Sequence, residues 1–321
     1  MNIYLFTDQF WIKQNNMYTF SIITPSFNQG QFLEDTIKSV LTQSGDFYID
    51  YIIADGGSTD NSVGIIRKYD NLLKGGQFPI KCKGITYRWW SKKDNGQSAA
   101  INEGFSVANG DIYAWINSDD FYNPGTVNLV SELFRKQELQ FIHGDAYMLD
   151  LNRGSYEKPR TFYKKSFDGN YNDLMDDDFI YQSSVFFKKD LFLNSERIDE
   201  NLVVALDYDL WIKMFGKLSK EQILYINKPL SSYRMWQASK TFSYLKISRK
   251  ERILLDKRYH MKFISPAILY NPCTAPFFYF LRNYVPLLLK IIKKPIIFLN
   301  NRKRYPKIKT IPPPPSFRST P

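Results

Sequence analysis

The sequence has 321 residues, of which 44% are hydrophobic and 17% aromatic, so it can build one large α/β domain or two smaller ones around a sizeable core. Its two cysteines are too few for a disulfide framework, which favours a reducing compartment. With only two histidines, a zinc cluster or a Ser-His-Asp site is a poor expectation. Residues 1–19 mix charged and amide side chains with apolar ones, so we do not expect a signal peptide there.

The net charge of +11 is concentrated near the C-terminal end. From Lys240 onward there are 18 Lys and Arg residues against Glu251 and Asp256, whereas residues 1–239 hold 25 basic and 30 acidic residues. The basic character is therefore a property of the tail and not of the folded domain. For this reason we expect no nucleic-acid partner.

Strands and helices alternate along the first third of the sequence. Apolar runs of strand length predict strands at residues 20–24, 51–54, 86–90 and 112–116. Apolar residues at helical spacing predict helices between them, at 32–41, 63–69 and 99–105. As caps of the first two helices we expect Asn28 or a neighbour, and Ser58 or Thr59. This alternation predicts a mostly parallel sheet whose ligand crevice lies beyond the carboxyl ends of the strands.

Polar side chains follow each of the four predicted strands. Asp55 precedes Gly56-Gly57, which permits a tight turn, and Asp94 opens an Asp-Asn-Gly-Gln-Ser segment. Each segment by itself could be an ordinary capped turn. Their shared position at strand ends indicates a common cleft instead. The side chains that we expect to converge on this cleft are Ser26, Asn28, Asp55, Asp94 and Asp119.

Two adjacent carboxylates, Asp119 and Asp120, come directly after the fourth predicted strand, and Pro124 prevents further pairing there. Adjacent carboxylates repel each other, and a divalent cation bound to a substrate diphosphate would compensate them. Mg²⁺ and Mn²⁺ favour such a combination of a few carboxylates with phosphate oxygens. The alternative is a turn in which these acids cap the next helix.

Four stretches in this order resemble the successive motifs of family 2 glycosyltransferases: residues 21–28, 55–60, 94–98 and 117–120. The resemblance covers roughly residues 20–240. It implies the GT-A fold, with a Rossmann-like, mostly parallel central sheet flanked by helices. It also implies an inverting transfer of a sugar from a nucleotide-diphosphate donor, usually a UDP-sugar, with Mn²⁺ or Mg²⁺ as cofactor.

The resemblance also assigns residues to the donor. Pro25 and Phe27 would border the nucleoside, Asp55 would bond to the base, and Asp94 would lie near the base and ribose. The implied donor-binding set is Pro25, Ser26, Phe27, Asn28, Asp55, Asp94, Asn117 and Ser118.

The metal ligand implied by the resemblance is Asp119, in a DXD-like motif. Asn117 stands where the family usually has the first acid of that motif. Further along, Ser232–Lys240 resembles a segment that commonly reads Tyr-Arg-x-His, but Trp236 takes the place of the histidine and cannot ligate a metal. Arg234 and Lys240 remain available to neutralise phosphate, or are simply exposed charges.

The second half of the domain should provide the acceptor side. Strands are expected at 141–145, where His143 should be packed rather than act as a ligand, and at 182–187. Residues 206–214 have an apolar helical face, and an acid at their start is also favoured by the helix dipole. The segment resembles the family motif that carries the catalytic base. This resemblance makes Asp207 the catalytic residue and Asp209 the reserve candidate.

The tail is rich in large apolar residues between 264 and 299, but prolines and lysines interrupt every stretch long enough to span a membrane. A polybasic cluster follows at 302–309. We expect a helical extension that lies on an anionic membrane surface, on its cytoplasmic face. The alternative is that these apolar residues pack against the domain. Peripheral attachment would suit a lipid-linked saccharide acceptor in cell-surface polysaccharide synthesis.

The expected organisation is an N-terminal segment (1–19), a GT-A domain (20–245) and a membrane-associating tail (246–321). Within the domain, 20–124 would bind the nucleotide and 125–245 the acceptor. An alternative function is a catalytically silent protein of this fold that binds a nucleotide-sugar or a lipid. A sugar nucleotidyltransferase is disfavoured, because no Gly-rich, Arg-containing phosphate loop follows the first strand.

Overall fold

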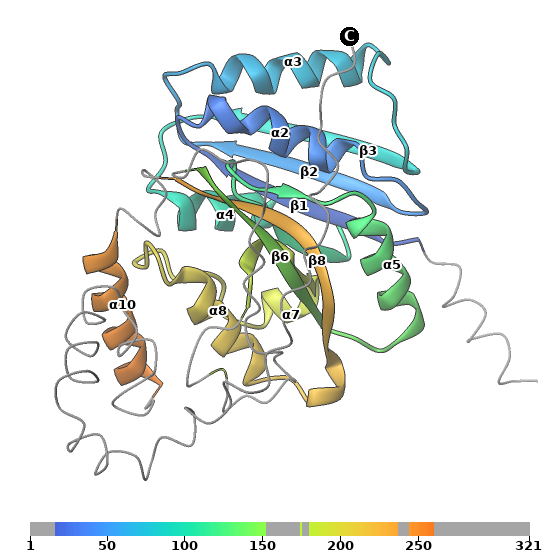
Figure 1. Cartoon of the computed structure of the whole chain (residues 1–321). Helices are drawn as coiled ribbons and strands as arrows, with labels where there is room; N and C mark the ends of the chain where they lie inside the picture. Colours follow the sequence, from blue (N-terminus) through green and yellow to red (C-terminus); the bar gives the residue numbers. More distant parts are fainter. Residues whose placement is uncertain (1–16, 152–173, 175–179, 237–243, 260–321) are drawn as a thin grey trace, which may run out of the picture.

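The computed structural model describes residues 17–151, 174, 180–236 and 244–259. Among these residues the centre of the molecule is an eight-stranded sheet with the order β3-β2-β1-β4-β7-β6-β8-β5 (Figure 1). Its first four strands are parallel: β1 (Thr19–Ser26), β2 (Tyr48–Asp55), β3 (Gly84–Ser91) and β4 (Ile112–Trp115). The predicted α/β fold with a mostly parallel sheet is confirmed. β1 runs past Pro25 to Ser26, which pairs with Asp55.

The remaining strands continue the sheet with mixed directions. β7 (Val185–Lys188) lies antiparallel between β4 and β6 (Phe141–Asp150). β8 (Ile223–Met235) runs parallel to β6, with an irregular register around Gly144 and Asp145, and pairs antiparallel with the short β5 (Phe121–Tyr122). This pairing returns the end of β8 to the residues that follow β4.

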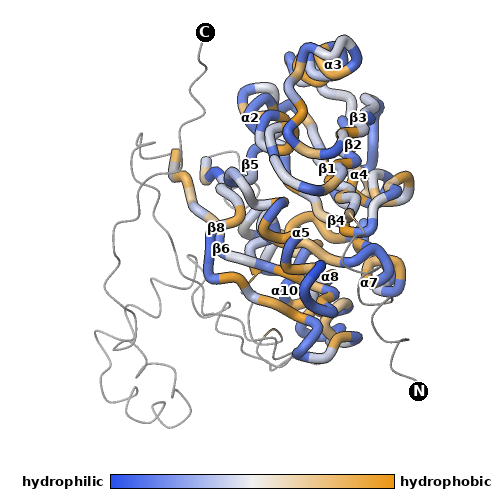
Figure 2. Tube along the Cα trace, turned by 90° about the vertical axis from the view of Figure 1, so that its right-hand side faces the viewer, coloured by the Kyte–Doolittle hydropathy of each residue, from blue (hydrophilic) through white to orange (hydrophobic). Residues whose placement is uncertain are grey.

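Helices cover both faces of the sheet (Figure 1). One face carries α2 (Gly30–Leu41), α3 (Ser62–Lys74) and α5 (Thr126–Lys136), whose apolar side chains share a cluster with Ile22. The other face carries α4 (Gln97–Ser106), α7 (Lys189–Leu193) and α8 (Leu206–Phe215), which pack with Ile23. Successive residues of a strand point to opposite faces of the sheet. The nearly continuous apolar runs therefore contribute side chains to a hydrophobic core on each face. Figure 2 shows hydrophobic and hydrophilic residues alternating along the helices, as expected for helices with one face against the sheet.

The helix starts beside the first two strand ends differ from the predicted caps. The N-cap residues are Gln29 and Asn61, and neither side chain caps its helix. Instead the carboxylate of Asp60 accepts the backbone N–H of Gly30 (2.8 Å) and of Ser62 (2.9 Å). One carboxylate thus satisfies the first turns of both α2 and α3, where the helix dipoles favour negative charge.

The core on the α8 side is aromatic. Trp211 stacks on Trp115 with ring centroids 5.3 Å apart, and both side chains are fully buried. Phe141 packs edge-on against Trp211, and His143 is buried two residues further along β6. The expectation that His143 is a packed strand residue is confirmed.

Replacing Trp211 with Ala is expected to lower the free energy of unfolding by about 3–5 kcal/mol, because the cavity left in this aromatic cluster cannot collapse completely. Urea denaturation followed by circular dichroism measures the change. Tyr48→Ala, at a side chain that is 41% exposed, is the matched control and should change the stability by less than about 1 kcal/mol. Similar losses in the two variants would contradict this description of the core.

α10 (Leu245–Arg258) begins at the predicted boundary between domain and tail but packs against the domain. Its Leu255 is completely buried in the α8-side core. The carboxylate of Glu251 accepts the backbone N–H groups of residues 203–205 at 2.7–2.9 Å. The predicted domain limits stay a prediction, but at least the start of the expected tail is part of the folded body.

In the described part of the chain, none of the helices combines the length and hydropathy needed to cross a membrane. The apolar stretch at 264–299, the polybasic cluster at 302–309 and Lys240 lie outside the described residues. The membrane expectations for the tail therefore stay predictions.

Candidate active site

A cleft of about 560 Å³ opens beyond the carboxyl ends of the parallel strands. It is enclosed by the residues that follow β1, β3 and β4, by the start of α4, by the end of β8 and by the residue preceding α10. The sequence-predicted residues that line it are Pro25, Ser26, Phe27, Asp94, Asn117, Ser118 and Asp119. Residues as far apart in the sequence as Pro25 and Tyr244 therefore meet in one cleft.

Phe27 forms the apolar part of this cleft on the β1 side. Its side chain is 61% exposed, although the phenylalanines of the two cores are buried. An exposed aromatic ring at the mouth of a polar cleft provides a flat surface on which a nucleobase can stack.

Asn28 and Asp55 lie directly behind the lining residues and not in the wall of the cleft. Asn28 has a φ of 52°, and its side-chain oxygen accepts the N–H of Thr59 at 2.8 Å. The Asp55 carboxylate accepts hydrogen bonds from both the N–H and the hydroxyl of Ser58 and from the hydroxyl of Ser91. The two side chains organise the loops that follow β1 and β2. A direct contact between Asp55 and a base stays a prediction.

Asp94 enters the cleft over a glycine. A Cβ atom added at Gly56 would lie 2.9 Å from Oδ2 of Asp94, so a larger residue at this position would displace the carboxylate. The same carboxylate accepts the N–H of Gly96 at 2.8 Å, which fixes the turn before α4. The Gly-Gly pair after β2 is therefore required for close approach of the next loop as well as for its own turn.

Asn117 is the centre of an amide network at the floor of the cleft. Its side-chain oxygen accepts a hydrogen bond from Gln97 at 2.7 Å, and its amide nitrogen donates to Gln182 at 3.2 Å. The hydroxyl of Ser118 donates to the side chain of Gln29. An asparagine joins donors and acceptors here, which an ionised aspartate could not do because it only accepts.

Asp119 is held by residues at the end of β8. The indole N–H of Trp236 donates to Oδ2 of Asp119 at 3.0 Å, and the guanidinium of Arg234 donates to the Asp119 carbonyl at 2.7 Å. Trp236 in turn packs edge-on against Phe32, with ring centroids 5.2 Å apart. The residue in the usual histidine position therefore contacts the predicted metal carboxylate through a hydrogen bond.

Asp120 differs from its neighbour in environment. It is buried, and it accepts the backbone N–H of Arg234 at 3.2 Å. Burial, reinforced by the charge of Asp119, raises the pKa of Asp120 well above its usual range. Both adjacent acids line the cleft, but because Asp120 is buried and its pKa is raised, Asp119 is the better candidate for binding a cation.

The groups around Asp119 fit a hard divalent cation that shares its shell with a diphosphate. Among the residues described, no three His, Cys, Asp or Glu side chains are grouped to hold a metal on their own. Around Asp119 the cleft offers its carboxylate, that of the adjacent buried Asp120, and hydroxyl and amide oxygens. Mg²⁺ and Mn²⁺ are often bound in this way, by one or two carboxylates plus substrate phosphates.

Asp207 lies in the first turn of α8, and its carboxylate accepts the N–H of Tyr208 at 2.8 Å. Asp207 is not in the wall of the cleft. The segment before it is hydrogen-bonded to α4 and to α10, the two helices that begin at the cleft. The hydroxyl of Ser98, next to Gln97, donates to the carbonyl of Leu202 at 2.7 Å. On the other side, Glu251 of α10 holds residues 203–205, as described above. The role of Asp207 stays a prediction.

Asp209, the reserve candidate, is fully buried and joins α8 to α10. One carboxylate oxygen accepts hydrogen bonds from Arg258 (2.9 Å) and from the hydroxyl of Tyr259 (2.7 Å), and Lys213 lies 2.7 Å from the other. These contacts describe a structural ion-pair network. They favour Asp207 over Asp209 as the acid that can reach a substrate.

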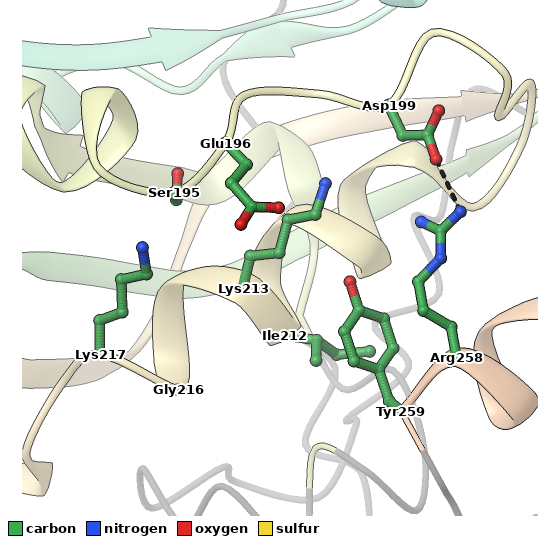
Figure 3. A pocket seen from close by; sticks show the side chains of 9 residues that line it. All are labelled: Ser195, Glu196, Asp199, Ile212, Lys213, Gly216, Lys217, Arg258 and Tyr259. Atoms are coloured by element: carbon green, nitrogen blue, oxygen red, sulfur yellow. Dashed lines mark ion pairs between the residues drawn. The ribbon is translucent and has the colours of Figure 1, made fainter.

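A second cavity, of about 580 Å³, lies between α8 and the end of α10 (Figure 3). Two of its basic side chains are balanced by carboxylates, Lys213 by Asp209 and Arg258 by both Asp199 and Asp209, and the third, Lys217, donates to the carbonyl of Asn194. The residues that line it include none of the catalytic, metal or donor-binding candidates predicted from the sequence. Size alone does not separate the two cavities, but their chemistry does, and we assign the candidate site to the first.

Several lining residues were not predicted from the sequence: Gln29, Gly96, Gln97, Ala100, Tyr233 and Tyr244. Gln97 belongs to the Asp-Asn-Gly-Gln-Ser segment and could have been found from it. Tyr244, by contrast, has no local signal, because only the packing of α10 brings it to the cleft. Burial raises the pKa of the Tyr233 hydroxyl above its usual value.

The chain belongs to glycosyl transferase family 2, whose model matches residues 21–195. An uncharacterized glycosyltransferase of Rickettsia bellii is 27% identical to it over 247 residues, which cover 72% of this chain and 33% of that protein. The matches cover between 31% and 61% of the length of these curated relatives. The predicted family membership is confirmed.

Solved structures establish the same fold. TarS of S. aureus, solved with UDP-GlcNAc, superposes with a TM-score of 0.55 at 16% identity, covering 74% of this chain and 66% of that one. The mannosyltransferase PcManGT from Pyrobaculum calidifontis, solved with GDP-Man and Mn²⁺, gives 0.53 at 10% identity, covering 83% and 74%. At such identities the likeness concerns the GT-A fold.

Proposed function

We propose that this glycosyltransferase moves a sugar from a UDP-sugar to a hydroxyl of a saccharide acceptor with inversion. The observation that carries the proposal is the meeting of Phe27, Asp94 and Asp119, from three separate strand ends, in one cleft. An aromatic surface, a carboxylate near it and a second carboxylate for a cation are the parts that a nucleotide diphosphate requires.

A panel of nucleotide sugars tests the donor. A ligand that binds the native state raises the melting temperature, and at equal concentrations the tighter ligand gives the larger shift. We expect the largest shift with a UDP-sugar in the presence of Mn²⁺, as TarS was solved with UDP-GlcNAc. A larger shift with a GDP-sugar, the kind of donor with which PcManGT was solved, would replace UDP with GDP in the proposal and leave the proposed reaction class unchanged.

Asp119 would hold the cation, with Ser118 and Asn117 beside it. When bound, a divalent cation supplies Lewis-acid stabilisation of the charge that develops on the departing diphosphate. The buried Arg234 donates to the Asp119 carbonyl, but Asp35 already pairs with its guanidinium at 2.6 Å, so it would offset little of the diphosphate charge. The chain itself thus neutralises only part of the diphosphate charge.

Asp207 would act as the general base. The attacking acceptor hydroxyl must lose its proton as the new bond forms on the face of the sugar opposite to the leaving diphosphate. A carboxylate on that face accepts the proton, and a single displacement inverts the anomeric configuration. The attachment of residues 202–205 to both α4 and α10 would fix the start of α8 for this role.

Trp236 gives a test of the proposed metal site that does not depend on turnover. Trp236→Phe keeps a ring against Phe32 but removes the N–H that orients the Asp119 carboxylate. The Mn²⁺ affinity of the protein–UDP complex should fall about tenfold, as is typical when a partner of a metal ligand is lost. Electron paramagnetic resonance of free Mn²⁺ measures it.

Trp236→His is the matched variant, because an imidazole can itself bind the metal. We expect it to bind Mn²⁺ more tightly than Trp236→Phe. If both variants bind Mn²⁺ as the native chain does and differ only in melting temperature, Trp236 is merely a packing residue.

We further propose that the acceptor is a lipid-linked saccharide in cell-surface polysaccharide synthesis and that the protein works on the cytoplasmic face of a membrane. The basic and apolar composition of residues 260–321 supports this. Incubation with a labelled donor and a lipid extract, followed by partition into organic solvent, tests it. Label that stays with water-soluble saccharides would contradict a lipid-linked acceptor.

A second candidate is a protein of this fold that binds a nucleotide-sugar without transferring it. Asn117 and Trp236 favour it, because each replaces a group that the family commonly places near the metal. Donor hydrolysis in the presence of Mn²⁺ separates the two candidates. Hydrolysis that Asp207→Asn abolishes supports the enzyme, whereas tight donor binding without any turnover supports the binding protein.

A further inference from the structure

α10 turns one continuous face toward solvent. The exposed side chains on this face are Lys246, Arg249, Lys250, Ile253, Leu254 and Lys257. Their spacing of three and four residues places them in one stripe along the helix. We call this set the outer face of α10.

The opposite face of α10 is firmly attached to the domain. Glu251 is 7% exposed and holds residues 203–205, and Leu255 is buried in the core. The guanidinium of Arg252 lies 4.4 Å from the ring centroid of Tyr208, and Arg258 pairs with Asp209. The outer face is therefore a fixed part of the surface of the catalytic domain.

The charge on α10 is divided between its two faces. Both of its carboxylates are turned away from the outer face: Glu251 binds the segment before α8, and Asp256 pairs with Arg252 at 3.1 Å. The outer face carries four cations from the helix. In its middle, two adjacent large apolar side chains, Ile253 and Leu254, are 39% and 45% exposed.

We infer that the outer face of α10 is a docking surface for a membrane that contains anionic lipids. Because the cations surround an exposed apolar pair, this face suits an anionic lipid surface better than an acidic polysaccharide. An acidic polysaccharide would use the lysines and arginines but gain nothing from Ile253 and Leu254. At a lipid surface the apolar pair enters the acyl boundary while the long basic side chains reach the headgroups.

The position of α10 links this surface to the cleft. Tyr244, the residue before the helix, lines the cleft, and the sequence that follows the described residues, 260–321, is also basic and apolar. A membrane on the outer face would thus bring its lipid headgroups close to one wall of the cleft. This position would explain how a lipid-linked acceptor reaches Asp207, and that explanation rests on the proposed function. The membrane contact itself is independent of the proposed function.

Flotation with the full chain tests the inference. We compare vesicles of phosphatidylcholine with vesicles that also contain phosphatidylglycerol. The native chain should float with the anionic vesicles, and the quadruple variant Lys246→Gln, Arg249→Gln, Lys250→Gln, Lys257→Gln should partition at least about tenfold less. Each basic residue near an anionic surface contributes about a fivefold change in partition. Ile253→Ser with Leu254→Ser should also reduce flotation, with the charge unchanged.

The matched control removes four exposed lysines from other elements: Lys68, Lys74, Lys83 and Lys136, each replaced with Gln. It has the same net charge as the quadruple α10 variant and should float nearly as the native chain does. Equal losses in both quadruple variants would reduce the effect to net charge and overturn the inference.

Two other results would also overturn the inference. In one, the α10 variants float as the native chain does, which would assign membrane binding to residues outside α10. In the other, the native chain does not float with the anionic vesicles. The melting-temperature shift with UDP and Mn²⁺ is measured on the same samples. If it is retained, a failure of the docking surface leaves the proposed function standing.

Discussion

Asp207→Asn is expected to lower the turnover number for the donor identified in the nucleotide-sugar screen by about 10²–10⁴-fold, the usual contribution of a general base. Donor affinity should stay within about twofold, because the substitution keeps the shape of the side chain and Asp207 lies outside the wall of the cleft. Steady-state kinetics gives the first quantity and calorimetry with UDP the second. An equal loss of donor affinity would move Asp207 into the donor-binding set.

Asp209→Asn is the control, two residues further along the same helix. It removes a buried charge that Lys213 and Arg258 balance, so we expect a loss of stability of about 3–5 kcal/mol instead of a selective loss of turnover. Donor binding should persist below the lowered melting temperature. If Asp209→Asn abolished turnover without changing stability, the roles of the two acids would have to be exchanged.

Asp119→Ala is expected to remove the effect of Mn²⁺ on donor binding. In the native chain we expect UDP to bind at least about tenfold more tightly with Mn²⁺, because the cation joins the carboxylate to the diphosphate. In the variant the affinities with and without Mn²⁺ should be equal, and turnover should fall by about 10²–10³-fold. Calorimetric titration of UDP at saturating Mn²⁺ and with chelator measures the four affinities.

Asp46→Ala removes the same charge from an exposed position and serves as the control. It should leave the Mn²⁺ effect unchanged. Metal-stimulated UDP binding that survives in Asp119→Ala would place the cation on other ligands, and the hydrogen bond from Trp236 would then have another purpose. The two substitutions separate a specific ligand from the general effect of a negative charge on a cation.

The fold of residues 20–124 was largely predictable from the sequence. Apolar runs ending in Pro25-Ser26 and in Asn117-Ser118 predicted strands whose polar ends share an edge, and both ends do line the cleft. The predicted cap side chains were wrong, because the carboxylate of Asp60 takes this role at both helix starts. Its contact with Ser62 is local, whereas its contact with Gly30 spans thirty residues and leaves no local signal.

What the sequence by itself determined is the alternation of buried strands and polar ends, and with it the fold, the family and the place of the cleft. Strand burial and turn chemistry are local properties that neighbouring residues express. Only the tertiary structure decided that Trp236 donates to Asp119, that Glu251 holds the segment before Asp207, and that α10 keeps an outer face. These contacts join residues from 46 to 117 positions apart. They arise from the packing of β8 and α10 against the rest of the domain, which no periodic pattern in the sequence predicts.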